Sequence, residues 1–187
     1  MAQTRRLLLY TLPLALFIVV TVLLYSGIGK DPTLLDSQMV GKVIPAFNKS
    51  RLLHANETIT EKDIQGPALI NVWGTWCPAC YHEHPLILKL AREDKVKIYG
   101  LNYNDKREDS IAYLKKMGNP YTAVIFDDNN RLMIDMGVYG APETFVIDKN
   151  NRIVHRHVGV ITEGVWQTKI KPKLQLTTEP ITAGEQK

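Results

Sequence analysis

The sequence predicts an α/β domain, in which helices cover both faces of a mixed central sheet, preceded by one N-terminal transmembrane helix. Three observations lead to this prediction. Residues 7–25 form an almost entirely apolar run that contains no charge. Short apolar runs then alternate with stretches of helical spacing, as in layered strand–helix units. Finally, two strand-like runs are joined by the turn residues Lys149, Asn150 and Asn151, which indicates a hairpin.

The apolar run Leu7–Tyr25 matches a membrane span in length. As a helix it would extend roughly 28 Å, close to the roughly 30 Å hydrocarbon core of a bilayer. Arg5 and Arg6 precede it, whereas Lys30 on the other side is offset by Asp31. The positive-inside rule therefore predicts that residues 1–6 are cytoplasmic and that the chain after residue 26 is exported. For a bacterial protein, this orientation predicts a single pass through the inner membrane and a domain in the periplasm, a compartment in which disulfide chemistry operates.

A cleaved signal peptide is the alternative to a permanent anchor. Gly27 and Gly29 form a small-x-small site that a signal peptidase could use. However, the apolar region of a signal peptide usually runs only about 7–15 residues, so the longer run favours an anchor.

After a linker over residues 26–42, one folded domain is expected over residues 43–174, followed by a polar tail over residues 175–187. Runs rich in β-branched, aromatic or aliphatic residues predict the strands Val43–Phe47, Arg51–His54, Thr58–Thr60, Pro67–Trp73, Val96–Leu101, Ala123–Phe126, Thr144–Asp148 and Ile153–Gly159. Helical spacing predicts the helices Pro78–Arg92, Lys106–Met117, Arg131–Met136 and Thr162–Leu174. Pro67–Trp73 is apolar throughout, as in a strand buried on both faces, and Pro172 is expected to end the last helix early.

The composition narrows the class of function. The net charge is +4, of which Arg5 and Arg6 supply two, and no basic stripe with interleaved aromatic residues is present. Nucleic acid is therefore not an expected partner. Cys77 and Cys80 are the only cysteines, three positions apart. A bridge over so short a loop stabilises little, so the pair indicates chemistry rather than structural cross-linking.

The cysteine pair follows a predicted strand and begins a predicted helix, the setting of a redox-active C-x-x-C disulfide. Unpaired N–H groups and the helix dipole favour a thiolate at Cys77, and Pro78 suits the first helical turn. Cys80, one turn further along, is expected to be less exposed. Cys77 is then the attacking thiolate and Cys80 the residue that resolves the mixed disulfide. Trp76 is expected at the surface, where it contacts the partner protein.

Other uses of the two cysteines fit less well. A zinc site that recruits His82 or His84 lacks a second cysteine pair or a distant pair of histidines. Covalent haem attachment requires His directly after the second cysteine, where Tyr81 stands. An inert structural pair remains a further alternative. The other histidines, His54, His155 and His157, are expected to be structural or exposed. No metal and no cofactor is predicted.

A second informative segment is Gly137-Val138-Tyr139-Gly140-Ala141-Pro142-Glu143-Thr144, directly before a predicted strand. Together with Trp76-Cys77-Pro78-Ala79-Cys80 it resembles the DsbE/CcmG group of thioredoxin-like proteins, the membrane-tethered thiol–disulfide interchange proteins of cytochrome c biogenesis. The resemblance covers nearly the whole chain and implies a thioredoxin-like fold. C-x-x-C alone specifies only the superfamily, whereas the second segment is much more selective.

The resemblance implies roles for particular residues. Pro142 matches the cis-proline of thioredoxin folds, which packs against the cysteine pair. The backbone at Ala141 is then available to pair with an extended substrate segment. Glu83 and Glu143 match acidic residues near the family's active site. Asn71, six residues before Cys77, replaces the buried Asp of ordinary thioredoxins, so either Glu is a candidate for the proton-transfer role.

The function that the resemblance implies is reduction of the disulfide in the C-x-x-C-H segment of apocytochrome c, so that haem can be ligated. The implied partners are apocytochrome c, a membrane electron donor of the DsbD/CcdA type and a haem-lyase assembly. Two alternatives remain open. The same fold can act as a general oxidant or isomerase, and an anchored chaperone could hold apocytochrome or haem without using its thiols.

Overall fold

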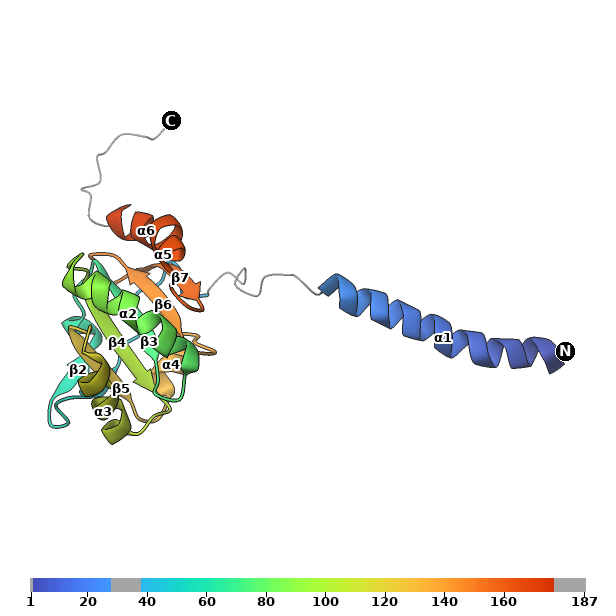
Figure 1. Ribbon diagram of the computed structural model, residues 1–187, viewed down its shortest axis with the longest axis horizontal. Coiled ribbons are helices and arrows are strands. Elements are labelled where there is room, and N and C mark those ends of the chain that lie inside the picture. The colour runs from blue at the N-terminus through green and yellow to red at the C-terminus, as the bar shows by residue number, and fades with distance from the viewer. Residues whose placement is uncertain (1, 28–37, 177–187) are drawn as a thin grey trace, which may run out of the picture. The chain divides into compact units, whose positions relative to one another are not determined.

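The computed structural model describes residues 2–27 and 38–176, which belong to two separate units, Met1–Leu35 and Asp36–Lys187. The first unit contains the helix α1 (Ala2–Gly27) (Figure 1). Pro13 lies inside this helix. Within residues 2–27 and 38–176, no helix combines the length and the hydropathy that a membrane crossing requires. The anchor expected over residues 7–25 stays a prediction. Residues 28–37 of the expected linker and 177–187 of the expected tail lie outside the described residues.

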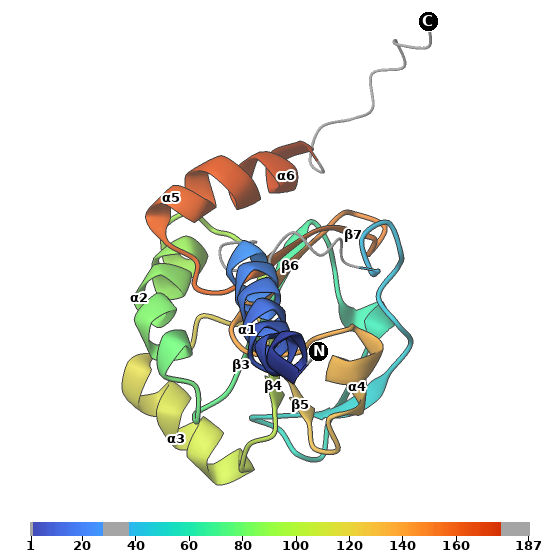
Figure 2. The same ribbon diagram turned by 90° about the vertical axis from the view of Figure 1, so that its right-hand side faces the viewer.

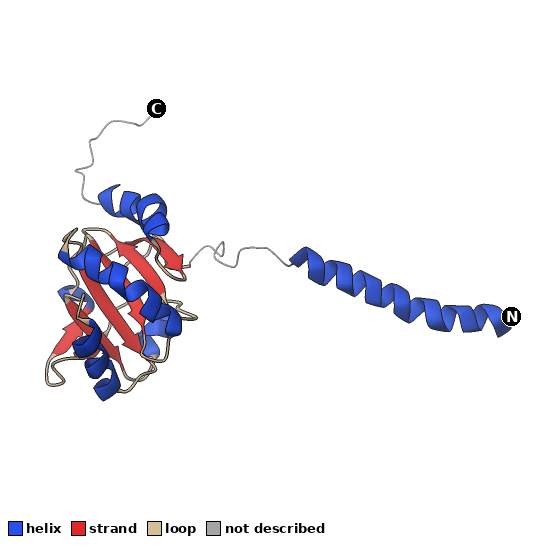
Figure 3. Cartoon of the chain, in the orientation of Figure 1, coloured by secondary structure: helices blue, strands red, loops and turns tan. Residues whose placement is uncertain are grey.

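The second unit is built on a sheet whose order is β2-β1-β5-β4-β3-β6-β7. The strands are β1 (Asn48–Arg51), β2 (Thr58–Thr60), β3 (Ala68–Trp73), β4 (Ile98–Tyr103), β5 (Ala123–Asp127), β6 (Glu143–Ile147) and β7 (Ile153–Val158). β3, β4 and β5 run parallel, and the other neighbours pair antiparallel. The predicted mixed sheet is confirmed (Figure 3).

Helices cover both faces of this sheet (Figure 2). One face carries α2 (Pro78–Arg92), α3 (Arg107–Met117) and a C-terminal helical segment made of α5 (Glu163–Val165), a π-helical turn (Trp166–Ile170) and α6 (Lys171–Leu176). The other face carries α4 (Arg131–Asp135). The short 3-10 helix Glu61–Asp63 leads directly to Ile64, which is buried in the core on this α4 side. The fold class that the sequence predicts, an α/β domain with two covered faces, is confirmed for this unit.

The central strand β3 has six buried residues that alternate between the two cores. Leu69 and Trp73 pack in the core under α2, whereas Ile70 and Val72 pack in the core on the α4 side. Because side chains alternate along a strand, Asn71 points to the α2 face. The strand therefore places one polar side chain beneath the helix that carries the cysteines.

Two expected strands before β2 are wrong. Residues 43–47 form no strand: Val43 makes only an isolated bridge to Arg152, and the strand begins at Asn48 instead. Pro45 has no N–H with which to continue a ladder, which explains the interruption. Of the strand expected over Arg51–His54, only Arg51 is in a strand, as the last residue of β1, because the chain bends directly after it.

Both ends of the domain differ from expectation. Within the predicted linker, Gly41 N–H donates to Ile153 O at 2.8 Å, so residues near 41 already belong to the folded unit. At the other end Pro172 does not terminate the helix, which continues to Leu176. The π-helical turn before Pro172, in which Lys171 N–H donates to Trp166 O, widens the helix where proline cannot donate.

Candidate active site

Cys77 and Cys80 form a disulfide at the start of α2, with their Cα atoms 5.4 Å apart. Cys77 is the N-cap residue of α2 and has an extended backbone, and Pro78 occupies the first helical turn. The N–H of Cys80 donates to Cys77 Sγ at 3.1 Å. A thiolate at Cys77 would therefore accept a hydrogen bond and lie at the positive end of the helix dipole, and both interactions stabilise its negative charge.

The two cysteines are equally buried in this oxidised state. Cys77 is 3% exposed and Cys80 is 4% exposed, so the expectation that Cys80 is the less exposed residue is wrong here. The bond between the two sulfurs brings both to the same depth. What distinguishes Cys77 is its place at the helix N-terminus rather than its accessibility. Beside it, Trp76 is 45% exposed, as the sequence predicts, and its Nε1–H donates to Tyr103 O at 3.2 Å.

A carboxylate that the sequence analysis missed fixes the turn before the cysteines. Asp105 accepts hydrogen bonds from the N–H and the hydroxyl of Thr75 at 2.7 and 2.6 Å, and from Asn102 Nδ2 at 3.0 Å. Burial alone would raise the pKa of Asp105, but these hydrogen bonds outweigh it and hold the pKa below its usual range. Asp105 could have been predicted from the sequence, because it belongs to a polar run that directly follows the buried strand β4. Functional groups often lie at this edge of a sheet, where parallel strands end.

Glu83 is buried beneath the cysteine pair. Its side chain is 2% exposed, and it lines one small pocket together with Cys80, Asn71 and Tyr121. Glu83 Oε1 accepts from Asn71 Nδ2 at 2.8 Å, and Oε2 accepts from the N–H of Ile161 at 2.9 Å. Burial raises the pKa of Glu83 to about 7, although both hydrogen bonds oppose the shift. This carboxyl group can therefore take up or release a proton near neutral pH, one helical turn from Cys80.

Replacing Glu83 with Gln is expected to flatten the pH dependence of stability. Glu83 binds its proton more tightly in the folded protein than in the unfolded chain. The protonated side chain therefore stabilises the fold fully below about pH 4.5, and this stabilisation is lost as the pH rises through about 7. The loss amounts to about 3 kcal/mol at most. Urea unfolding of the oxidised protein between pH 4 and 8 measures this slope. Equal slopes in Glu83→Gln and the parent chain would show that Glu83 titrates normally.

Asn71 connects Glu83 to two further polar groups. Its Nδ2 also donates to Thr144 Oγ1 at 3.1 Å, and its Oδ1 accepts from the Tyr121 hydroxyl at 2.9 Å. Tyr121 and Tyr113 both pack against Trp73. The buried Tyr113 hydroxyl, in contrast, finds no hydrogen-bond partner among residues 2–27 and 38–176.

These two tyrosines provide a matched pair of substitutions. Tyr121→Phe leaves Asn71 Oδ1 without its donor and is expected to destabilise the protein by about 1–2 kcal/mol. Tyr113→Phe removes a hydroxyl that makes no hydrogen bond, so we expect no loss of stability or a slight gain. Chemical denaturation measures the free energy of unfolding of both variants and of the parent chain. Equal losses in the two variants would contradict the hydrogen-bond network.

Glu143 lies on the opposite face of the sheet from Glu83. Thr144 points toward Asn71 under α2, and its neighbour Glu143 therefore points to the α4 side. There Glu143 Oε2 accepts from Arg156 Nε at 2.8 Å, and Oε1 accepts from the N–H of Tyr139 at 3.2 Å. The structure thus brings Glu83, but not Glu143, into the pocket that Cys80 lines.

The segment before β6 packs against the core that includes the two cysteines. The Ala141–Pro142 peptide bond is cis. Ala141 packs against the core cluster that contains Cys77 and Cys80, and also against the core on the α4 side. Pro142 O accepts from the N–H of Gly159 at 2.9 Å. Cys77, Cys80 and Ala141, far apart in the sequence, therefore share one cluster of packed side chains.

Of the two histidines near the cysteines, His84 makes a contact away from them. His84 is buried, and its Nε2 lies 2.9 Å from Gly118 O, which ties α2 to the end of α3. Within residues 2–27 and 38–176, no group of three or more His, Cys, Asp or Glu side chains is placed to hold a metal ion.

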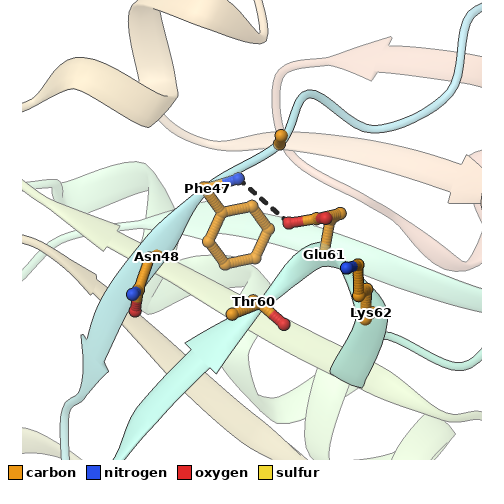
Figure 4. Close-up of a pocket in the computed structure, with 6 residues that line it drawn as sticks. Phe47, Asn48, Thr60, Glu61 and Lys62 are labelled. Atoms are coloured by element: carbon orange, nitrogen blue, oxygen red, sulfur yellow. Dashed lines mark hydrogen bonds between the residues drawn. The ribbon is translucent and has the colours of Figure 1, made fainter.

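An open pocket of about 420 Å³ lies elsewhere, beside the edge strand β2 (Figure 4). In it the N–H of Phe47 donates to Glu61 Oε2 at 3.1 Å, and the other lining residues are Ala46, Asn48, Thr60 and Lys62. It shares no lining residue with the segments that carry the disulfide and Pro142.

Comparisons with known proteins agree with this geometry. A family model described as Redoxin matches residues 39–170. The thiol:disulfide interchange protein DsbE of Pseudomonas aeruginosa is 46% identical over 171 residues, which cover 90% of this chain and 94% of the relative. The DsbE protein of Escherichia coli K12 is 40% identical over 169 residues, which cover 86% and 90%.

Solved structures add evidence on the fold alone. A thio-disulfide isomerase from Thermus thermophilus matches with a TM-score of 0.62 at 23% identity, covering 76% of this chain and 99% of that one. A secreted thiol-disulfide isomerase from Corynebacterium glutamicum matches with a TM-score of 0.58 at 22% identity, covering 73% and 86%. With the sequence matches to the relatives, these findings place the chain in the DsbE family of thiol:disulfide interchange proteins, thioredoxin-like thiol–disulfide oxidoreductases with a Redoxin domain.

Proposed function

We propose that this protein is a membrane-tethered periplasmic reductase that reduces the C-x-x-C-H disulfide of apocytochrome c before haem is ligated. The observation that carries the proposal is the packing of Ala141 against the cluster that contains Cys77 and Cys80. An extended client segment that pairs with the backbone at Ala141 would lie against the core that holds the cysteine pair, which is where its disulfide must be presented. The resemblance of the segment around Ala141 to the cytochrome c biogenesis group supplies the client.

The exchange balances as a two-electron transfer. In the reduced protein, the Cys77 thiolate attacks one sulfur of the client disulfide, which breaks that bond and forms a mixed disulfide. The released client sulfur leaves as a thiolate and takes a proton from solvent. Cys80 then loses its proton and attacks Cys77 Sγ, which releases the second client thiol and forms the Cys77–Cys80 disulfide seen here.

Glu83 is the proposed acceptor of the Cys80 proton. The two residues line the same pocket, and burial raises the pKa of Glu83 to about 7. A base with a pKa near the working pH is suited to proton transfer. Glu143 does not line the pocket with Cys80, since it lies on the other face of the sheet in contact with Arg156.

Each turnover leaves the protein oxidised, so an electron donor must restore the dithiol. We propose a membrane donor of the DsbD/CcdA type for this step, and work alongside a haem-lyase assembly. The uncharged run Leu7–Tyr25 supports a tether, which raises the effective concentration of the domain near membrane partners. Protease treatment of spheroplasts tests this placement: the domain after residue 37 should be digested without lysis. Protection until the cells are lysed would argue against export.

The proposed reaction is tested by mixing the reduced protein with an oxidised peptide that contains C-x-x-C-H. We expect reduction of the peptide and oxidation of Cys77 and Cys80 in equal amounts. A peptide with the same composition but a disulfide in an unrelated sequence is the control, and it should react more slowly.

The chaperone alternative has its own test in cells. A chain with both Cys77→Ala and Cys80→Ala should fail to support cytochrome c maturation if the thiols carry the function. Normal maturation with this variant would favour a non-enzymatic role.

A further inference from the structure

Arg156 on β7 is buried beneath the segment that precedes β6. The exposed fractions of the Arg156 and Glu143 side chains are 5% and 1%. The guanidinium carbon lies 4.1 Å from the centre of the Tyr139 ring and 5.6 Å from that of the Phe145 ring. Arg156 thus contacts aromatic rings that come before and after Pro142 in the chain.

A carboxylate joins this guanidinium to the backbone of the segment. Glu143 Oε2 accepts from Arg156 Nε at 2.8 Å, and Arg156 Nη2 lies 2.6 Å from the same oxygen. The other oxygen, Oε1, accepts from the N–H of Tyr139 at 3.2 Å. β7, β6 and the Tyr139–Pro142 segment are therefore held by one buried ion pair.

The Tyr139 ring that covers the Arg156 guanidinium is itself exposed to solvent. Tyr139 is 61% exposed, although its ring lies over a guanidinium that is almost fully buried. A planar guanidinium can stack against a ring and hold a carboxylate at the same time, whereas a lysine ammonium is a point charge that offers no such plane. The role therefore requires arginine and not merely a positive charge.

We propose that Arg156 is a positioning residue that sets the affinity for the client by holding the Tyr139–Pro142 segment in its binding geometry. The proposal rests on the function proposed above, in which this segment pairs with the client. Arg156 and Glu143 lie on the face of the sheet opposite to Glu83. The contact should therefore affect client binding without changing the chemistry of Cys77 and Cys80.

The test compares Arg156→Lys with the parent full-length chain. Because each reaction leaves the chain oxidised, KM and kcat are taken from single turnovers of the pre-reduced chain, as the half-saturating substrate concentration and the limiting rate. Two substrates are used: the oxidised C-x-x-C-H peptide, and oxidised glutathione, which is too small to pair along the segment. We expect KM for the peptide to rise about tenfold in Arg156→Lys, a loss typical of one truncated contact in an interface. The kcat for the peptide and the rate with glutathione should stay within about twofold of the parent values, and the reduction potential should not change.

Two further variants complete the design. Tyr139→Leu removes the exposed ring but keeps the ion pair, and it should raise KM by a smaller factor. Arg131→Lys alters an exposed ion pair with Asp135 on α4 and should leave every value unchanged. If Arg156→Lys were poorly folded, Tyr139→Leu would still report on the segment through KM.

An unchanged KM for the peptide in both Arg156→Lys and Tyr139→Leu would overturn the inference, as would equal losses with peptide and glutathione. A failure of the proposed function looks different. In that case the parent chain reduces an unrelated disulfide peptide as well as the C-x-x-C-H peptide, while Arg156→Lys still raises KM for both.

Discussion

Replacing Cys80 with Ser is expected to stop the reaction at a mixed disulfide between Cys77 and the client. Cys77 is the N-cap of α2, where it gains thiolate character, so the first attack should proceed in this variant. The second attack cannot occur, because no resolving sulfur remains. We expect turnover to fall by on the order of 10³-fold or more, which corresponds to about 4 kcal/mol of activation free energy. Mass spectrometry of the quenched reaction detects the covalent adduct.

Cys77→Ser is the matched control, because it removes the other sulfur of the same disulfide. It should lose turnover to a similar extent and accumulate no adduct. The reverse pattern, with an adduct in Cys77→Ser and none in Cys80→Ser, would mean that Cys80 is the attacking residue and that the helix N-terminus does not select the nucleophile.

Replacing Asn71 with Leu is expected to destabilise the protein by about 3–5 kcal/mol, since it leaves buried polar groups unpaired. Asn71 is 1% exposed and bonds to Glu83, Thr144 and Tyr121. Leucine has a similar volume but can satisfy none of the three. The pKa of Glu83 should also rise further, because a hydrogen bond that favours its carboxylate disappears. Chemical denaturation gives the stability, and the pH profile of client reduction gives the pKa.

Thr144→Val provides a milder comparison on the same network. It removes one hydrogen bond to Asn71 and should cost about 1 kcal/mol, with little change in the pH profile. If Asn71→Leu were as stable as the parent chain, or if its pH profile did not move, then Asn71 would not be what holds Glu83 in place.

Local signals in the sequence were enough to predict the element that carries the cysteines. α2 spans Pro78–Arg92 as predicted, because proline favours the first turn and the apolar spacing defines the buried face. The same signals failed before β2, where Pro45 interrupts an otherwise strand-like run. They also failed at Pro172, where a π-helical turn allows the helix to continue.

The contacts that give the site its chemistry come from tertiary packing. Glu83 and the N–H of Ile161 are 78 residues apart in the chain, and only the folded sheet brings them together. Asn71 stands out in the sequence as a polar residue in an apolar strand, but nothing local identifies its partners. Likewise, side chains alternate along β6, so Thr144 points to the α2 face and Glu143 to the other face, away from Glu83. The distance in sequence between Glu83 and Glu143 does not predict this.

The reduction potential of the Cys77–Cys80 pair tests the central claim most directly. The full chain is equilibrated with glutathione or dithiothreitol mixtures, and the fractions of dithiol and disulfide are measured. A reductase should have a potential well below the roughly −120 mV of the strong oxidant DsbA, toward the roughly −270 mV of thioredoxin. A value near −120 mV would contradict the account, because the protein would then oxidise its clients instead of reducing apocytochrome c.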